Sequence, residues 1–290
     1  MRFAFIQAEK AEFGVSQLCE ALNVSRAGFY AWCYRPQSAH DVEDERLKVL
    51  VHEAHHREGR TYYGSPRVHR ALKKKGVCVG RKRIVRLMQE EALVGRARRR
   101  FKHTTDSNHT LAVADNLLQR EFTADAPNQR WVGDVTELRT PSGKLYLAVI
   151  IDLFSRFVVG WALSAVNDRH LALKALDMAL RRRCPGLGLM HHSDRGSPYA
   201  SEDYQAALDA RHITCSMSRS GNCLDNAAME SWNSTLKSEL GEDFASPADT
   251  KAKLFDYIEV FYNQTRMHSS LDYASPAEFE RAARALKVAA

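Results

Sequence analysis

Residues 130–163, RWVGDVTELRTPSGKLYLAVIIDLFSRFVVGWAL, decide the fold of this chain. They contain three apolar runs, Arg130–Arg139, Leu145–Leu153 and Arg156–Leu163, which predict three successive strands. The turn-forming residues at 141–143, PSG, separate the first two runs and predict an antiparallel hairpin.

The pattern changes to alternating helix and strand after this sheet segment. We predict a helix at Arg169–Arg183, a strand at Leu187–His192, a helix at Glu202–Arg211 and a fifth strand at Ile213–Ser218. Three antiparallel strands followed by helix–strand alternation are typical of an α/β fold. We therefore expect a mixed five-stranded sheet with helices on both faces.

Three carboxylates occupy distinct positions in this pattern. Asp134 lies inside the first strand, Asp194 ends the apolar run LGLMHHSD, and Glu230 lies on the helical stretch DNAAMESWNSTLKSEL. Each alone has an ordinary explanation, as an edge-strand residue, a turn cap and half of a helix ion pair. The first and fourth strands can be neighbours, however, and like charges brought together there call for a cation. Oxygen-only ligands favour magnesium or manganese.

Helix geometry gives Glu230 its surroundings. A polar stripe and an adjacent apolar stripe run along its helix, so the carboxylate borders the core. The polar stripe is Asn226, Glu230, Asn233 and Lys237, and the apolar stripe is Met229, Trp232, Leu236 and Leu240. Lys237 could meet a phosphate. Asp152 is the main competitor for the site, and we interpret it as a strand-turn residue beside Arg156.

No activated nucleophile is evident in the sequence. Ser193 beside His192 suggests a serine hydrolase, but neither a Gly-x-Ser-x-Gly turn nor a P-loop occurs. Two metal ions that activate water or a DNA hydroxyl would remove the need for a nucleophile.

The N-terminal half predicts DNA binding. Residues 14–34 fit two short helices capped by Ser16 and Ser25, either a helix-turn-helix or an ordinary helical hairpin. From Arg60 to Lys102, fifteen Lys or Arg face only two acids, a bias expected of a phosphate-binding surface. The candidate DNA contacts are Arg81, Lys82, Arg83, Arg86, Arg98, Arg99 and Arg100. The alternative is a solvated basic face.

Composition excludes several classes of protein. No run of about 18 apolar residues predicts a membrane span, and MRFAFIQAEK lacks the features of a secretory signal. The six cysteines include no Cys-x-x-Cys pair, which argues against a disulfide framework. We expect a cytoplasmic protein with reduced thiols and no membrane partner.

Five segments follow from these patterns. We predict an N-terminal helix-turn-helix-like segment at 1–40, a basic helical DNA-binding domain at 41–102 and a linker at 103–125. A catalytic core at 126–240 and a C-terminal helical extension at 241–290 complete the chain.

The chain resembles the second-reading-frame product (OrfB) of bacterial insertion sequences of the IS-three family. The motifs that carry the resemblance run nearly end to end: VSRAGFYAW, YYGSPRVHRAL, WVGDVTEL, IDLFSRFVVGWALS, HHSDRGSPYAS, SRSGNCLDNAAMESWNSTLKSEL and YIEVFYNQTRMHSSLDYASPAEFE. These proteins are DDE transposases with a retroviral-integrase-like catalytic core. The resemblance implies a ribonuclease-H-like fold, a triad at Asp134, Asp194 and Glu230, and a basic residue at Lys237.

The resemblance also implies a reaction and partners. It implies metal-dependent cleavage that exposes a 3′-hydroxyl at the element's end, followed by strand transfer into target DNA. We expect two Mg²⁺ ions, replaceable by Mn²⁺, terminal inverted repeats as substrate, a homo-oligomer on DNA, and an upstream-frame protein as partner or fusion. A non-catalytic DNA-binding regulator and a general ribonuclease-H-type nuclease remain as alternatives.

Overall fold

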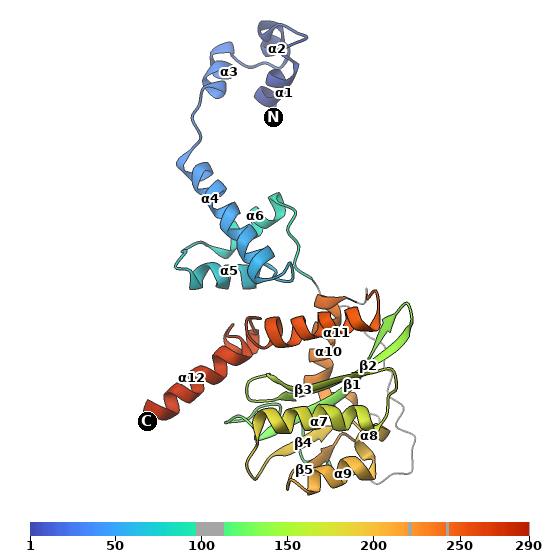
Figure 1. Ribbon diagram of the computed structural model, residues 1–290. Helices are drawn as coiled ribbons and strands as arrows, with labels where there is room; N and C mark the ends of the chain where they lie inside the picture. The colour runs from blue at the N-terminus through green and yellow to red at the C-terminus, as the bar shows by residue number, and fades with distance from the viewer. Residues whose placement is uncertain (97–112, 220–221, 242–243, 290) are drawn as a thin grey trace.

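A computed structural model describes residues 1–96, 113–219, 222–241 and 244–289. Three groups of elements follow one another along the chain: three short N-terminal helices, a helical unit, and a sheet covered by helices (Figure 1). None of the helices in these ranges is long and apolar enough to cross a membrane.

The sheet has the predicted mixed topology. Its strands are β1 (Arg130–Thr140), β2 (Gly143–Asp152), β3 (Val158–Ser164), β4 (Met190–Ser193) and β5 (Thr214–Met217). They lie in the order β3-β2-β1-β4-β5, with antiparallel β1–β2 and β2–β3 pairs and parallel β1–β4 and β4–β5 pairs. The prediction of a mixed five-stranded sheet is therefore confirmed. The β3 strand begins later than expected because Arg156 adopts a positive φ of 61° in the preceding turn.

Helices cover both faces of the sheet. On one face, Trp131, Ala148 and Ile150 pack in a core with α7 (Arg169–Arg183) and α9 (Glu202–Asp209). Alternate residues of the same strands, such as Val132 and Val149, point to the opposite core. This alternation is the period of two expected of a sheet buried on both sides.

The second core is built by α10 (Ala227–Leu240) and the C-terminal segment. Met229, Trp232 and Leu236 are buried in it, so the predicted apolar stripe is confirmed. The segment continues through α11 (Pro247–Phe255), a π-helical stretch, η3 (Asp256–Tyr262), a short 3-10 turn, η4 (Ser269–Leu271), and α12 (Pro276–Ala289). Two more short elements, α8 (Ser197–Ala200) and η2 (Cys223–Asn226), were not predicted, because each spans only about one turn.

The helical unit shares the second core. It comprises α4 (Ala39–Glu53), a π-helical turn η1 (Ala54–Glu58), α5 (Ser65–Lys74) and α6 (Arg81–Glu90). Val68, Leu72 and Ile84 belong to the same buried cluster as Trp232. The Tyr63 hydroxyl accepts a hydrogen bond from the backbone nitrogen of Met267 at 2.9 Å. The unit is thus packed against the C-terminal segment.

The described part of the predicted linker also packs on the core. Leu118 is 1% exposed, and the Ser216 hydroxyl on β5 accepts hydrogen bonds from the backbone of Leu117 and Leu118. Residues 113–125 therefore contribute to the fold of the sheet domain.

The N-terminal helices α1 (Arg2–Glu9), α2 (Val15–Ala21) and α3 (Arg26–Cys33) have a small core of their own, built on Ile6, Cys19 and Phe29. Ser25 caps α3, as predicted, by accepting a hydrogen bond from Gly28 at 3.0 Å. The prediction that Ser16 caps α2 is wrong. That helix begins one residue earlier, with Gly14 at the N-cap position, so Ser16 lies within it.

Candidate functional site

Asp134 and Asp194 lie at one edge of the sheet. Gly133 on β1 and Ser193 on β4 are paired in parallel register, and each aspartate is the next residue along its chain. The predicted neighbourhood of the first and fourth strands thus places the two carboxylates side by side in the sequence of the ladder.

The two aspartates interact electrostatically. Burial raises the pKa of Asp134 well above 3.8, the nearby charge of Asp194 raises it further, and Glu230 adds a smaller effect. The side chain of Asp194 accepts a hydrogen bond of 2.9 Å from the backbone nitrogen of Gly196, which fixes its orientation. Two half-buried carboxylates that repel each other in this way form a place where a cation would be stabilised.

A residue of α10 connects its helix to this pair. The Asn233 amide donates a 2.6 Å hydrogen bond to Asp134 Oδ2. Glu230 lies three positions earlier on the same helix and is exposed. Within the described ranges, no three or more His, Cys, Asp or Glu side chains are arranged to hold a metal ion. The structure thus brings Asp134 and Asp194 together and leaves Glu230 apart from them on the neighbouring helix.

Aromatic and imidazole groups line the buried side of the site. Tyr199 is buried beside the two aspartates, and burial raises the pKa of its hydroxyl well above 10. A Cβ atom at Gly133 would lie 3.0 Å from His191 Nε2. Glycine at this position therefore lets the His191 ring pack directly against the strand that carries Asp134.

The histidine that precedes Ser193 does not activate it. His192 is buried, and its two ring nitrogens are hydrogen-bonded to Ser216 at 2.8 Å and Ser218 at 3.2 Å. The Ser193 hydroxyl donates to the carbonyl of Asp194. Burial lowers the pKa of His192 to about 4. This arrangement argues against a serine hydrolase.

Asp152, the competing carboxylate, belongs to a turn. It is fully buried at the end of β2 and accepts hydrogen bonds from the backbone nitrogens of Asn128 at 2.7 Å and Phe154 at 2.9 Å. Both of its oxygens therefore serve the local chain.

Two predicted DNA contacts lie on or next to α10. Lys237 is half-buried in the last turn of the helix. Asn226 precedes the helix and is 6% exposed, and its amide donates to the carbonyl of Gly133 at 3.4 Å. In this structure Asn226 supports the strand that carries Asp134, and DNA contact by either residue stays a prediction.

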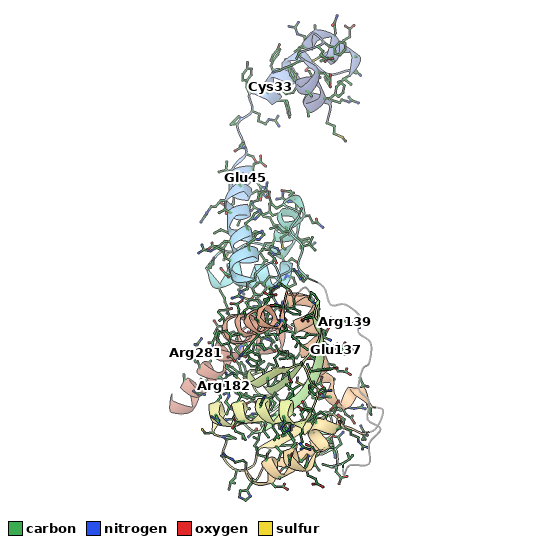
Figure 2. The ribbon with its side chains drawn as sticks, turned by 45° about the vertical axis from the view of Figure 1, so that its right-hand side comes forward. Cys33, Glu45, Glu137, Arg139, Arg182 and Arg281 are labelled. Carbon is green, nitrogen blue, oxygen red and sulfur yellow. The ribbon has the colours of Figure 1, made fainter. Side chains whose placement is uncertain are left out.

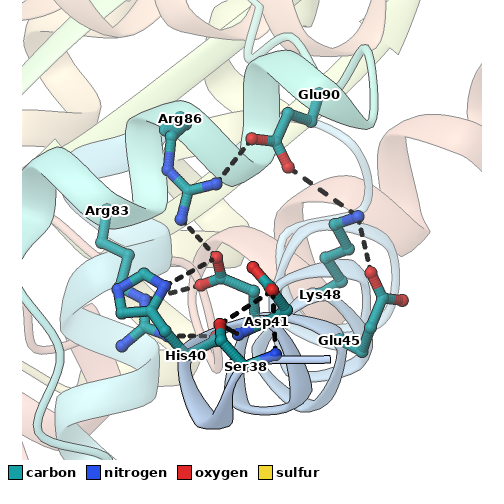
Figure 3. A network of polar contacts seen from close by, with 9 residues as sticks. Ser38, His40, Asp41, Glu45, Lys48, Arg83, Arg86 and Glu90 are labelled. Atoms are coloured by element: carbon teal, nitrogen blue, oxygen red, sulfur yellow. Dashed lines mark hydrogen bonds and ion pairs between the residues drawn. The ribbon is translucent and has the colours of Figure 1, made fainter. Parts of the chain in front are cut away.

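The predicted contacts on α6 separate into two kinds. Arg81 and Lys82 are exposed at the start of the helix. Arg83 and Arg86 instead form ion pairs with Asp44 of α4, at 2.6 and 2.5 Å (Figure 3). The side-chain hydrogen bond of Arg86 is the first cause that lowers the pKa of Asp44 to about 2. Arg98, Arg99 and Arg100 lie outside the described residues.

Asn233 is the site residue that sequence reasoning did not assign. It was placed on the polar stripe of the Glu230 helix without a role. Its position three residues after Glu230, on the same helix face, is the signal from which a role could have been proposed.

Known families match this chain in three places. Integrase core domain families match residues 124–223 and 211–276, and an HTH-like domain family matches residues 42–101. The integrase core matches cover the sheet and the C-terminal elements packed on it, and the HTH-like match covers the α4–α6 unit.

Relatives align over nearly the whole chain. The transposase InsF of insertion sequence IS3A from Escherichia coli is 40% identical over 97% of this chain and 98% of its own length. An uncharacterized 31 kDa protein of insertion element IS600 from Shigella sonnei is 44% identical over 90% of this chain and 97% of its own length.

Solved integrases share parts of the architecture at low identity. The intasome of a simian T-cell lymphotropic virus is 16% identical over 77% of this chain and 72% of its own, with a TM-score of 0.47. The HTLV-2 integrase catalytic core, solved in complex with magnesium, is 20% identical over 54% of this chain and 98% of its own, with a TM-score of 0.41. The fold assignment rests on the strand order and the integrase core families. The chain therefore belongs to the IS3 family of insertion-sequence transposases and is a DNA transposase with an integrase-type catalytic core.

Proposed function

We propose that Asp134, Asp194 and Glu230 form the catalytic triad of this transposase. The observation that carries the proposal is the position of Asp134 and Asp194 at paired ends of β1 and β4, where the charge of Asp194 raises the pKa of Asp134. Asn233, from the helix of Glu230, is hydrogen-bonded to Asp134. The third carboxylate is thus carried by an element already attached to the other two.

The donor set fits Mg²⁺ or Mn²⁺. All three side chains offer carboxylate oxygens, which these ions prefer, and the repulsion between Asp134 and Asp194 would be relieved by a divalent cation. Glu230 is exposed, so its carboxylate is available to complete the ligand set. Two such ions would supply the polarisation of attacking and leaving oxygens that in-line phosphoryl displacement requires.

The remaining residues position DNA and the carboxylates. Asn233 holds one oxygen of Asp134, and Gly196 holds one oxygen of Asp194. Lys237 follows Glu230 by seven positions, so it lies on the same face of α10, where a phosphate next to the cleaved bond would meet a positive charge. Together these groups would fix the scissile phosphate for cleavage that exposes a 3′-hydroxyl, and then for its transfer to target DNA.

The partners of the reaction are also proposals. We propose that the substrates are the element's terminal inverted repeats and target DNA in the bacterial cytoplasm, bound by a homo-oligomer. We further propose that an upstream-frame protein, separate or fused, assists in pairing the ends.

The experiment is cleavage and strand transfer on a labelled element end with Mg²⁺, with and without the upstream frame. Asp134→Asn, Asp194→Asn and Glu230→Gln should each abolish turnover while leaving DNA affinity intact, and Asp152→Asn should retain it. Activity that survives all three substitutions would sink the assignment. Binding without turnover by the wild type in either form would indicate a regulator, and cutting that ignores the terminal repeats would indicate a general nuclease.

A further inference from the structure

A cavity of about 410 Å³ lies on the other side of α10 from Glu230. Its walls come from the HTH-like unit, the β2–β3 turn, α10 and the segment 262–270. At about 100° per residue, Ser231, Thr235 and Ser238 of the cavity wall lie roughly 100° or more around the helix from the centre of the Glu230–Lys237 stripe. The cavity is therefore distinct from the carboxylate site, although both use the same helix.

Arginine dominates the charge of this cavity. Arg67, Arg96, Arg156 and Arg266 line it, against a single carboxylate, Glu239. His268 adds no charge at neutral pH, because burial, followed by the charges of nearby arginines, lowers its pKa well below 6.5. The walls therefore carry an excess of positive charge.

Two of the four arginines are compensated by the carboxylate. Arg266 and Glu239 form a buried bidentate pair, with nitrogen–oxygen distances of 2.6 and 2.7 Å. Arg67 reaches the same carboxylate at 3.2 Å. Glu239 has no oxygen left for a further cation.

The other two arginines have no carboxylate partner among the residues that the structure describes. Arg156 donates to the carbonyl of Phe122 at 2.7 Å, and Arg96 lies over the ring of Tyr62, with 5.7 Å from its guanidinium carbon to the ring centroid. Arg156 is half-buried in a left-handed turn conformation that glycine adopts at lower cost. An arginine there, next to an uncompensated cation from another domain, indicates a site for an anion.

We propose that this cavity binds a backbone phosphate of a DNA strand. Guanidinium forks match phosphate oxygens in geometry and charge, and the exposed hydroxyls of Ser269 and Ser270 at the rim add donors. DNA is favoured over a small free anion because Arg96 belongs to the HTH-like unit and Arg156 to the catalytic core. A strand held between them would join DNA binding to the helix that carries Glu230.

The test is DNA affinity as a function of salt, measured on the full chain by fluorescence anisotropy with a duplex of the element's end in EDTA. Arg96→Gln and Arg156→Gln should each lower the slope of log affinity against log salt by about 0.9, and the double variant should lose roughly tenfold or more in affinity. Arg281→Gln, an exposed arginine of α12, is the matched control and should change neither quantity (Figure 2).

Three outcomes decide the proposal. Unchanged affinity and slope in folded Arg96→Gln and Arg156→Gln would overturn it. If Arg156→Gln fails to fold, Arg96→Gln alone decides, because that side chain is exposed. If inorganic pyrophosphate raises the melting temperature of the wild type but not of the double variant, while DNA affinity is equal in both, the cavity takes a free phosphate and the DNA assignment is wrong. Glu230→Gln should bind DNA normally, so failure of the triad would not affect this result.

Discussion

The amide of Asn233 and the carboxylate of Asp134 are joined by a 2.6 Å hydrogen bond that crosses from α10 to β1. The bond favours the charged form of Asp134, against the burial that raises its pKa. It also ties the helix of Glu230 to the strand of the first aspartate.

Asn233→Ala should therefore weaken metal use more than folding. Partners that orient a metal ligand typically change metal affinity or activity by about 10- to 100-fold when removed, and we expect the Mg²⁺ concentration for half-maximal strand transfer to rise within that range. Ser234→Ala, the neighbouring position on α10, is the control. An unchanged Mg²⁺ dependence in Asn233→Ala would show that the hydrogen bond has no role in the site.

The sequence predicts the places of the two aspartates but not their contacts. An apolar run that contains Asp134 and another that ends at Asp194 are enough to place both at strand positions of one sheet. That Asn233 bonds to Asp134 depends on the rotation of α10 over the sheet. Side-chain packing in the core sets this rotation, and helical periodicity only narrows it to a face.

Glu239 and Arg266 form a buried ion pair, and each side chain is about 5% exposed or less. Glu239→Gln should lower the free energy of unfolding by about 3 kcal/mol, because it leaves a buried guanidinium without its counter-charge. The double variant Glu239→Met with Arg266→Met should recover most of this loss. Urea unfolding is the measurement. Glu45→Gln, in an exposed pair with Lys48, is the control and should change stability by at most about 0.5 kcal/mol (Figures 2 and 3).

This pair also shows why the junction of the domains was beyond the sequence. Glu239 lies on the catalytic helix, Arg266 in the C-terminal segment and Arg67 in the HTH-like unit. Composition separates the basic unit from the core because charge changes along the chain. Their shared buried cluster arises from contacts between residues about 170 to 200 positions apart, for which local periodicity carries no signal.

Asp152 should give the stability a distinct pH dependence. Burial raises its pKa from 3.8 to about 6 in the folded state. Between about pH 4 and 6 the folded chain therefore holds a proton that the unfolded chain has lost, so this group makes the unfolding free energy fall as pH rises. Two units at about 1.4 kcal/mol each amount to a fall of about 3 kcal/mol, complete above pH 6.

Asp152→Asn isolates this effect. The amide offers one acceptor oxygen where Asn128 and Phe154 require two, so the variant should be less stable at every pH. The difference from the wild type should shrink between pH 4 and pH 7, measured by urea unfolding at both values. A difference that is the same at both would mean that the Asp152 pKa is not raised.

Lys82 and Asp44 should affect different properties of the HTH-like unit. Lys82 is exposed at the start of α6, whereas Asp44 holds Arg83 and Arg86 and so fixes α6 on α4 (Figure 3). Lys82→Ala should leave the melting temperature unchanged and reduce the salt dependence of DNA affinity by about 0.9 in log–log slope, the effect of one lost phosphate contact. Asp44→Asn should lower the melting temperature, because two cations lose their shared counter-charge. Its salt slope should not fall, since the arginines it releases are not removed. If instead Lys82→Ala leaves the slope unchanged, the start of α6 is a solvated basic face and DNA contacts the unit elsewhere.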